Sequence, residues 1–499
     1  MRKKRRLYLA LVLATALLFV ATSARAKTYE VFGKSLDFFW YLTQNMSLNL
    51  GGDHYDTERG VQGLLSSFLV EGNYKLRDDL RLYVAAGLAA DWVYDVKHDD
   101  RTWNDRKFSD SSEFLYLDDE YWQVLKEAHL NWSPGNFFFR VGKQIVKWGE
   151  TDGFRLMDQI NPADQRRGFA DVEFETSVIP IWLVRAEYFP PIYTSWLQNL
   201  GFEVVFNPNV DFIPNQPIRT GNDAGGIWAP NVQIPGAFPG GYMRVGKSVD
   251  NIEEPDGSEG YEYALRIKGI VKDAIITLNY FYGRDDTPVT RSAGPPTFTT
   301  ASDGIMVLHQ VNSGYYPRVQ FVGGTLARDI QQLKTSILGN VSPVLRLEAF
   351  YAIDNTFRNS LNAFEKYDEL RWAMGLDWNL RVPFLNPTNS FYISPQIYNR
   401  RIMEYPSTYN LGSALENSYT TSLLISTKYL HNKLKPSFFW MHDLNNHADM
   451  YKVQCAYEHN ENWIYTLGAL FLNGQEPGNG FQVFENKDYL YFKISYKWG

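Results

Sequence analysis

Hydrophobic and polar residues alternate along several long stretches of the chain. From 80 to 94 the even positions are apolar and end in Trp92 and Tyr94, whereas the odd positions are mostly small or charged. Successive side chains of a β-strand point to opposite faces, so such a stretch has one apolar face and one polar face. The same pattern recurs at 261–268, 345–351, 370–379 and 490–498. The alternation predicts β-strands with one apolar face and one polar face.

These predicted strands have the properties of membrane strands. The stretch 80–94 exceeds the roughly 5–6 residues of a typical soluble strand and fits a membrane strand of about 9–11 residues with an overhang. The apolar faces begin and end in Tyr and Trp, as in the aromatic girdles at the two interfaces of a membrane barrel. We therefore predict an all-β protein, a single transmembrane antiparallel β-barrel.

Polar connections of alternating length separate the predicted strands. Short turns are predicted at 77–79, 134–136, 272–273, 431–434 and 459–462. Long loops are predicted at 95–119, 149–175, 207–259, 285–317, 355–368, 403–418 and 474–487. Short periplasmic turns and long extracellular loops are typical of outer-membrane barrels. Counting strands between these connections predicts about 18, with 16 as the alternative because 36–50 and 201–206 are weakly patterned.

The two ends of the chain carry export signals. Five basic residues at 2–6 precede an apolar run at 7–20 and a small-x-small site at 24–26, which together predict a cleaved signal peptide over 1–26. The apolar run is too short for a transmembrane helix of about 20 residues. Residues 27–499 are then the barrel. The last strand ends on aromatic Trp498, one residue before Gly499, and so resembles the signal read by the outer-membrane assembly machinery.

Composition agrees with a barrel and excludes several other classes. Aromatic residues make up 16% of the chain, yet the mean hydropathy is only −0.33, because a barrel turns only every second residue towards lipid. The net charge is −7, and the loss of the six basic residues of 1–26 leaves −13, which disfavours nucleic-acid binding. The single cysteine, Cys455, excludes an internal disulfide and lies on an apolar strand face. We expect no metal and no other cofactor.

The polar faces of the strands are expected to line a lumen of mixed charge. Arg140, Arg266, Lys268 and Arg371 are predicted to face it, with acidic residues on neighbouring strands. These charges either form internal ion pairs that brace the wall or create a transverse field that orients a solute. A mixed lumen argues against strong selection of one ion sign, which needs rings of one charge.

A long polar segment follows Trp148. It mixes acids, arginines and turn residues, and Asn161-Pro162 prevents a long helix. Long loops in compact folds are usually functional or disordered. We predict an inward-folded constriction loop near 149–168, with an ordinary surface loop as the alternative. The residues predicted at the constriction are Glu150, Asp158, Asp164, Arg166 and Arg167.

The start of this segment resembles a family signature. The stretch 141–150 (VGKQIVKWGE), followed by Asp158 and by Asn-Pro-Ala-Asp at 161–164, is similar to a proteobacterial porin-like outer-membrane family catalogued as a domain of unknown function. Family members more often have Arg where this chain has Lys143, and 190–200 is an additional segment here. The resemblance implies a barrel and a genomic setting often tied to transport of hydrophobic compounds or lipids. It implies no established catalytic residues.

Motifs that suggest an enzyme lack the context that their chemistry needs. Residues 241–248 match the phosphate-loop pattern, but nearby prolines and glycines disfavour the strand and helix that a phosphate site requires. The eight histidines form no metal-protease motif, and only His442-Asp443 and Asp53-His54 are adjacent acid–histidine pairs. We predict that the protein is not an enzyme.

The sequence thus predicts a pore for solutes in the cell outer membrane. One alternative is a conduit for hydrophobic compounds or lipids that works with an inner-membrane pump. Another is a barrel sheath that holds a periplasmic or electron-carrier partner. The expected partners are outer-membrane lipid and lipopolysaccharide, the assembly machinery, and a periplasmic or inner-membrane transport protein, but no nucleic acid.

Overall fold

The computed structural model describes the chain from residue 27 onward, with gaps. The described residues are 27–51, 59–97, 116–151, 155–167, 177–217, 232–233, 242–245, 249–300, 306–334, 341–476, 479–484 and 487–499. The predicted signal peptide at 1–26 therefore lies outside the described residues. Among the described helices, none is long and apolar enough to cross a membrane.

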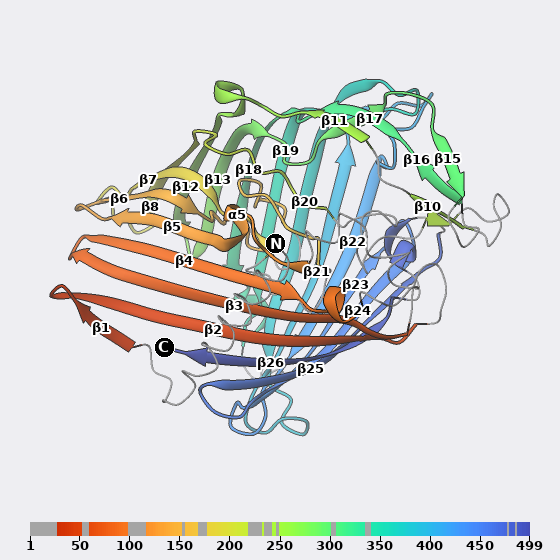
Figure 1. The fold of residues 1–499 in the computed structure, drawn as a ribbon. Coiled ribbons are helices and arrows are strands. Elements are labelled where there is room, and N and C mark those ends of the chain that lie inside the picture. Colours follow the sequence, from red (N-terminus) through yellow and green to blue (C-terminus); the bar gives the residue numbers. More distant parts are fainter. Residues whose placement is uncertain are drawn as a thin grey trace.

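Eighteen antiparallel strands form a closed barrel, which confirms the predicted fold class (Figure 1). The first and last of them pair with each other, from Trp40 opposite Trp498 to Asn49 opposite Tyr489. The barrel strands are β2 (Lys34–Asn49), β3 (Gly60–Arg77), β4 (Leu80–Asp91), β5 (Leu125–Trp132), β6 (Phe137–Gln144), β7 (Ile181–Tyr188), β8 (Leu197–Asn207), β12 (Glu262–Val271), β13 (Ala274–Arg284), β18 (Arg318–Asp329), β19 (Val344–Arg358), β20 (Phe364–Leu380), β21 (Phe391–Ile402), β22 (Asn417–Ser426), β23 (Leu434–Asp443), β24 (Ala448–Glu458), β25 (Trp463–Gly474) and β26 (Tyr489–Trp498).

The remaining elements are short and lie outside the barrel wall. Strand β1 (Lys27–Val31) forms a hairpin with the start of β2. The other elements are α2 (Val93–Val96), α5 (Tyr121–Val124), β9 (Val232–Gln233), β10 (Tyr242–Val245), β11 (Val249–Glu253), η4 (Gly257–Gly260), β14 (Val289–Ser292), β15 (Thr297–Thr300), β16 (Met306–His309), β17 (Val311–Tyr315), η5 (Gln331–Leu333) and η6 (Gly480–Phe484). They belong to connections between barrel strands.

Connections of different length leave the two ends of the barrel, which we call the short-turn end and the long-loop end. The short-turn end holds two-residue turns such as 78–79 and 272–273, together with the C-terminus. One predicted long loop, 355–368, is wrong. Strand β19 continues to Arg358 and β20 begins at Phe364, so most of this region is paired strand. Asn355, Arg358, Glu365 and Lys366 interrupt the apolar alternation there, although Phe357 is buried against Ile402 and Leu411.

The outer face of the barrel is apolar, as the alternation predicts. Outward residues with large exposed apolar side chains include Leu130, Val141, Val322, Met374, Val453 and Leu467. Near the short-turn end, Trp40, Trp463, Tyr496 and Trp498 contact one another in an aromatic belt. Inward positions are polar and buried, among them Thr43, Asn45, Thr277, Asn279 and Glu348. A greasy exterior around a polar interior is the arrangement of a membrane barrel.

The outward assignment can be tested on two neighbouring residues of β24. We expect Val453→Arg to lower the free energy of unfolding in lipid bilayers by about 2–4 kcal/mol, because the charge enters hydrocarbon. Gln454→Arg should cost roughly 1 kcal/mol, the value of one hydrogen bond, since Gln454 faces the interior and accepts a 2.8 Å bond from Tyr491. Equal losses in a denaturant titration would show that the two faces are misassigned.

Candidate functional site

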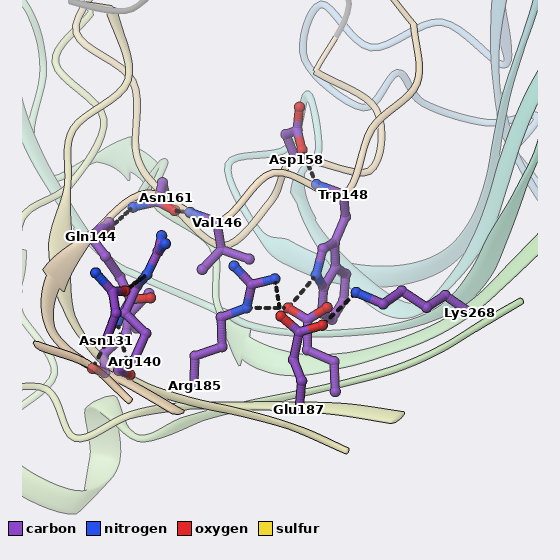
Figure 2. A network of polar contacts seen from close by, with 12 residues as sticks. Asn131, Arg140, Gln144, Val146, Trp148, Asp158, Asn161, Arg185, Glu187 and Lys268 are labelled. Atoms are coloured by element: carbon purple, nitrogen blue, oxygen red, sulfur yellow. Dashed lines mark hydrogen bonds and ion pairs between the residues drawn. The ribbon is translucent and has the colours of Figure 1, made fainter. Parts of the chain in front are cut away.

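The chain between β6 and β7 does not form a simple turn, and the Asn161 side chain joins its two ends. Its Oδ1 accepts a 2.8 Å hydrogen bond from Val146 N. Its Nδ2 donates to Gln144 O and to Ile179 O, each at 3.0 Å. Figure 2 shows Asn161 between the end of β6 and Val146. One buried amide thus links the exit from β6 to the entry into β7. The described residues between these strands, 145–151, 155–167 and 177–180, are called the inserted segment below.

Asp158 fixes the first bend of this inserted segment. Its carboxylate accepts hydrogen bonds from Trp148 N at 2.6 Å and Gly149 N at 2.9 Å. A Cβ at position 149 would lie 3.0 Å from the Asp158 carboxylate, so glycine suits this close approach. Arg155 donates to the Asp158 and Asn161 carbonyls. The segment therefore has a defined conformation built on its own side chains.

Apolar side chains attach the inserted segment to the inner wall of the barrel. Leu156, Met157 and Ile160 are almost completely buried. They cluster with inward residues of β7, β8, β12, β13 and β18 to β20, namely Ile181, Leu183, Val205, Ala264, Phe281, Phe321, Phe350, Ala352 and Ala373. Burial of apolar surface contributes about 25 cal/mol per Å². The segment is therefore packed against one side of the lumen.

Trp148 joins the segment to a chain of charges on β7, β8 and β12. Its indole N–H donates to Glu203 at 3.2 Å, and Arg185 bridges Glu203 at 2.9 Å and Glu187 at 2.7 Å. Lys268 also pairs with Glu187, as Figure 2 shows. The Arg266 guanidinium lies 5.9 Å from the Trp148 ring centroid. These contacts match the wall-bracing alternative for the lumen charges.

Arg140, also predicted to face the lumen, lies beside this chain of charges. It donates to Asn131 at 2.7 Å, and its guanidinium carbon is 5.5 Å from the Phe138 ring centroid. It is therefore held by the wall of β5 and β6.

A polar latch connects the segment to the distant strand β19. Glu348 accepts from the backbone N–H groups of Glu150 and Thr151, and Arg346 donates to the Glu150 carbonyl. Arg346 also pairs with Asp377 on β20 at 2.7 Å. Burial raises the pKa of the Glu150 carboxyl, against the nearby charges of Arg266 and Arg346. Because β6 and β19 are separated by several strands around the barrel, the segment crosses part of the lumen.

Arg166 and Arg167 pair with acids at the other end of the segment. Arg166 makes a two-point contact with Asp164, at 2.9 and 2.6 Å, and Arg167 pairs with Asp118 at 2.7 Å. Burial alone would raise the pKa of Asp164, but the hydrogen bond and charge of Arg166 outweigh burial and lower it. The two arginines are buried in ion pairs, and neither lines the large cavity described next.

A cavity of about 1250 Å³ remains between the segment and the wall. On the segment side it is lined by Arg155, Asp158, Gln159 and Asp164, and the connection after β13 adds Asp285 and Asp286. The opposite wall contributes Phe321, Phe350, Arg371, Arg400, Phe439, Met441, Met450, Lys452, Gln454, Ala456, Thr466 and Lys493. Arg371 and Arg400 share the carboxylate of Glu369. The cavity is therefore acidic on one side and basic with apolar patches on the other.

The structure divides the predicted site residues into three groups. Asp158, Asp164 and Arg371 line the large cavity. Glu150, Arg166 and Arg167 are fixed in contacts that hold the segment, and Arg140, Arg266 and Lys268 belong to the wall. The sequence predicts that Glu348 faces the lumen, but not that it accepts hydrogen bonds from the inserted segment. The apolar group around Met441 was not among the predicted site residues, and nothing in the sequence indicates which loop meets it.

The phosphate-loop pattern and the histidine–acid pair of the sequence lie in strands of the structure. The described part of 241–248 is strand β10, which pairs with β9 and β16, and His442 lies 2.9 Å from Asp449. Asp53 and His54 lie outside the described residues. Across the described ranges, no group of three or more His, Cys, Asp or Glu side chains is placed to hold a metal ion.

A closed antiparallel barrel with an apolar exterior and a polar lumen defines the porin-like class of outer-membrane β-barrel folds. Within that class, the chain belongs to the family described as "Protein of unknown function (DUF1302)", whose model matches residues 10–498. The resemblance drawn from 141–164 is thereby confirmed. No curated protein matches the chain.

Several solved outer-membrane structures are similar to the chain along nearly its whole length. Salmonella typhi OmpF in complex with daunomycin is 10% identical, with a TM-score of 0.41, over 95% of this chain and 100% of that one. Acinetobacter baumannii OccAB3 is 8% identical, with a TM-score of 0.47, over 93% and 99%. Pseudomonas aeruginosa OccD3 (OpdP) is 9% identical, with a TM-score of 0.45, over 96% and 96%.

Proposed function

We propose that the protein is an outer-membrane channel that passes anionic solutes carrying an apolar part. The observation that supports this most is the lining of the large cavity. Its wall places Arg371, Arg400, Lys452 and Lys493 beside Phe439, Met441 and other apolar side chains. Basic groups attract an anion, and apolar side chains contact the rest of the solute. In this proposal the short-turn end of the barrel faces the periplasm. The first barrel strand begins there and the last one finishes there.

The inserted segment supplies the narrowing in this proposal, and the wall supplies the basic and apolar groups. It narrows the lumen of a barrel that would otherwise have room for a wide aqueous channel. Charges act more strongly in such a confined space than in open water, because the local dielectric constant is lower. The filled lumen also disfavours the sheath alternative, since a sheath needs a wide interior for its partner.

Flux measurements on proteoliposomes test this proposal. Rates through the protein are obtained by subtracting the flux into liposomes without protein. Benzoate should then enter faster than uncharged benzyl alcohol and faster than benzylammonium, because only benzoate combines an anion with an apolar ring. A tenfold KCl gradient across a planar bilayer should give a reversal potential of the sign that favours chloride. Equal rates for all three solutes, or a potential favouring potassium, would refute the proposal.

A second candidate is the conduit for hydrophobic compounds. It is favoured by a buried apolar cluster inside β24 to β26 beneath η6, made by Met450, Leu470, Leu472, Phe484, Tyr489 and Tyr491 with Phe439, Met441, Phe481 and Val483 around it. A conduit of this kind would transport uncharged apolar solutes as fast as benzoate. The same flux series therefore separates the two candidates.

Acidification should increase the preference of the channel for anions. Burial raises the pKa of Asp285 and Asp286, and the charges of Glu262 and Asp285 raise that of Asp286 further. These carboxyls therefore become neutral at a higher pH than an ordinary Asp near 4, and the cavity loses negative charge first. We expect the anion preference to rise as pH falls from 7 to 5. In a variant with Asp285→Asn and Asp286→Asn it should already be high at pH 7 and change little.

A further inference from the structure

A second, smaller cavity of about 370 Å³ lies on the other side of the inserted segment. Asp164 lines both cavities, so this part of the segment separates them. The barrel side of the small cavity is the inner face of β2 to β5. Its lining includes Phe39, Tyr41, Thr43, Asn45, Leu65, Ser67, Leu69, Glu71, Gly87, Ala89, Asp118, Lys126, Arg167 and Lys497.

The middle of the small cavity is apolar although it faces the lumen. Leu69 and Gly87 lie opposite each other on β3 and β4, and Leu65 and Ala89 continue the same surface. A Cβ at Gly87 would meet Lys126 Cε at 3.2 Å and Phe68 O at 3.3 Å, so glycine keeps this space open. An apolar occupant would remove this surface from water, which is favourable.

A lysine side chain, Lys126, lies beside the apolar middle of the small cavity. Lys126 lies at a bulge of β5, where Glu127 pairs with Ala85 and Leu125 with Ala86. Among the described residues, the Lys126 ammonium has no hydrogen bond or ion pair. Asp118 and Asp164 are close enough to act on it electrostatically, but their carboxylates already bind arginines.

The other described charges around this cavity have partners other than Lys126. Arg166 and Arg167 pair with Asp164 and Asp118. Glu71 accepts from Tyr83 at 2.9 Å, and Lys497 lies 5.7 Å from the Tyr41 ring centroid. Lys126 lies beside Gly87, which pairs with Leu69, so its side chain is next to the apolar surface.

We infer that the small cavity binds a single-chain amphipathic carboxylate, with its head on Lys126 and its tail along Leu65, Leu69 and Ala89. The carboxylate accepts a hydrogen bond from the Lys126 ammonium, and a buried charge-assisted pair is the strong type of hydrogen bond. The volume falls within the range of about 300–1,000 Å³ that small ligands use. This site is separate from the passage proposed above and does not depend on conduction through it.

The test measures retention of radiolabelled laurate by the full-length barrel in zwitterionic nanodiscs, with empty nanodiscs subtracted and 1-dodecanol as the uncharged control. We expect saturable laurate binding that Lys126→Met weakens at least tenfold and Lys126→Arg less than threefold. Dodecanol binding should not respond to either change. Ala89→Phe, which fills the apolar part, should weaken both ligands. Heat-modifiable migration on gels confirms that each variant is folded.

Two results would overturn the inference. Laurate binding that is unchanged by Lys126→Met would show that the ammonium does not hold the carboxylate. Loss of laurate binding when the nanodiscs contain anionic phospholipid would assign the charge to a lipid headgroup instead. Binding that survives this lipid exchange and still depends on Lys126 supports a free amphipathic anion.

Discussion

A barrel in which a short Gly–Ser linker replaces residues 155–165 should conduct several times more current than the wild type. This change removes Leu156, Met157 and Ile160, which hold the segment against the wall. It also removes Asp158 and Asp164 from the lining of the large cavity. An eighteen-strand barrel without a filler has an interior wide enough for an aqueous channel, so the narrowest cross-section should widen. Single-channel recording in planar bilayers measures the effect.

The matched control shortens a connection that supplies no lining residue. Residues 404–413 lie between β21 and β22 and pack around Leu411 at the long-loop end. Their replacement by the same linker should leave conductance within about a factor of two. Charges and side chains outside the narrow part of a pore affect the current less than those inside it. If both deletions fold, as heat-modifiable migration reports, and both leave conductance unchanged, the segment does not restrict the passage.

Reversal of two charges should change the ion preference. Lys452 and Lys493 line the large cavity from β24 and β26. Lys452→Glu with Lys493→Glu changes the local charge by four units at a confined position, where rings of one sign set selectivity. We expect the reversal potential in a tenfold KCl gradient to change sign, from chloride-favouring to potassium-favouring.

The control for this change carries the same substitutions outside the cavity. Lys428 and Lys433 are exposed in the turn between β22 and β23, so Lys428→Glu with Lys433→Glu alters net charge equally. Salt screens such exposed charges over about 10 Å at 0.1 M, and the reversal potential should shift by only a few millivolts. Similar shifts in the two double variants would show that the potential reports overall charge rather than the lining.

The alternation of side chains was sufficient to predict most of the barrel. Strand faces depend on local order, because a strand in lipid must turn apolar residues outward at every second position. The error at 355–368 has the same origin. In the outer part of the β19–β20 hairpin, charged and amide residues such as Arg358 and Glu365 interrupt the alternation, and Asp354 adopts a positive φ. A strand whose alternation is interrupted has a sequence pattern close to that of a polar loop.

The site was less predictable because its contacts join residues far apart in the chain. The latch brings Glu150 to Glu348, 198 residues later, and Arg167 pairs with Asp118, 49 residues earlier. The sequence indicated that the segment near 149–168 was unusual and that Asn161-Pro162 prevents a long helix in it. The sequence could not show that Arg166 and Arg167 form buried ion pairs, since any exposed acid could have served as a partner.

The central claim, that the large cavity is a water-filled passage, is tested most directly at two adjacent positions of β24. Ala456 lines the cavity, whereas Cys455 lies opposite outward-facing Leu467 on the lipid side. We expect a charged methanethiosulfonate reagent to reduce single-channel current stepwise in Ala456→Cys with Cys455→Ser. The wild type, with Cys455 alone, should conduct without block. A conducting barrel whose current is insensitive to the reagent at position 456, or is blocked through Cys455, would contradict the claim.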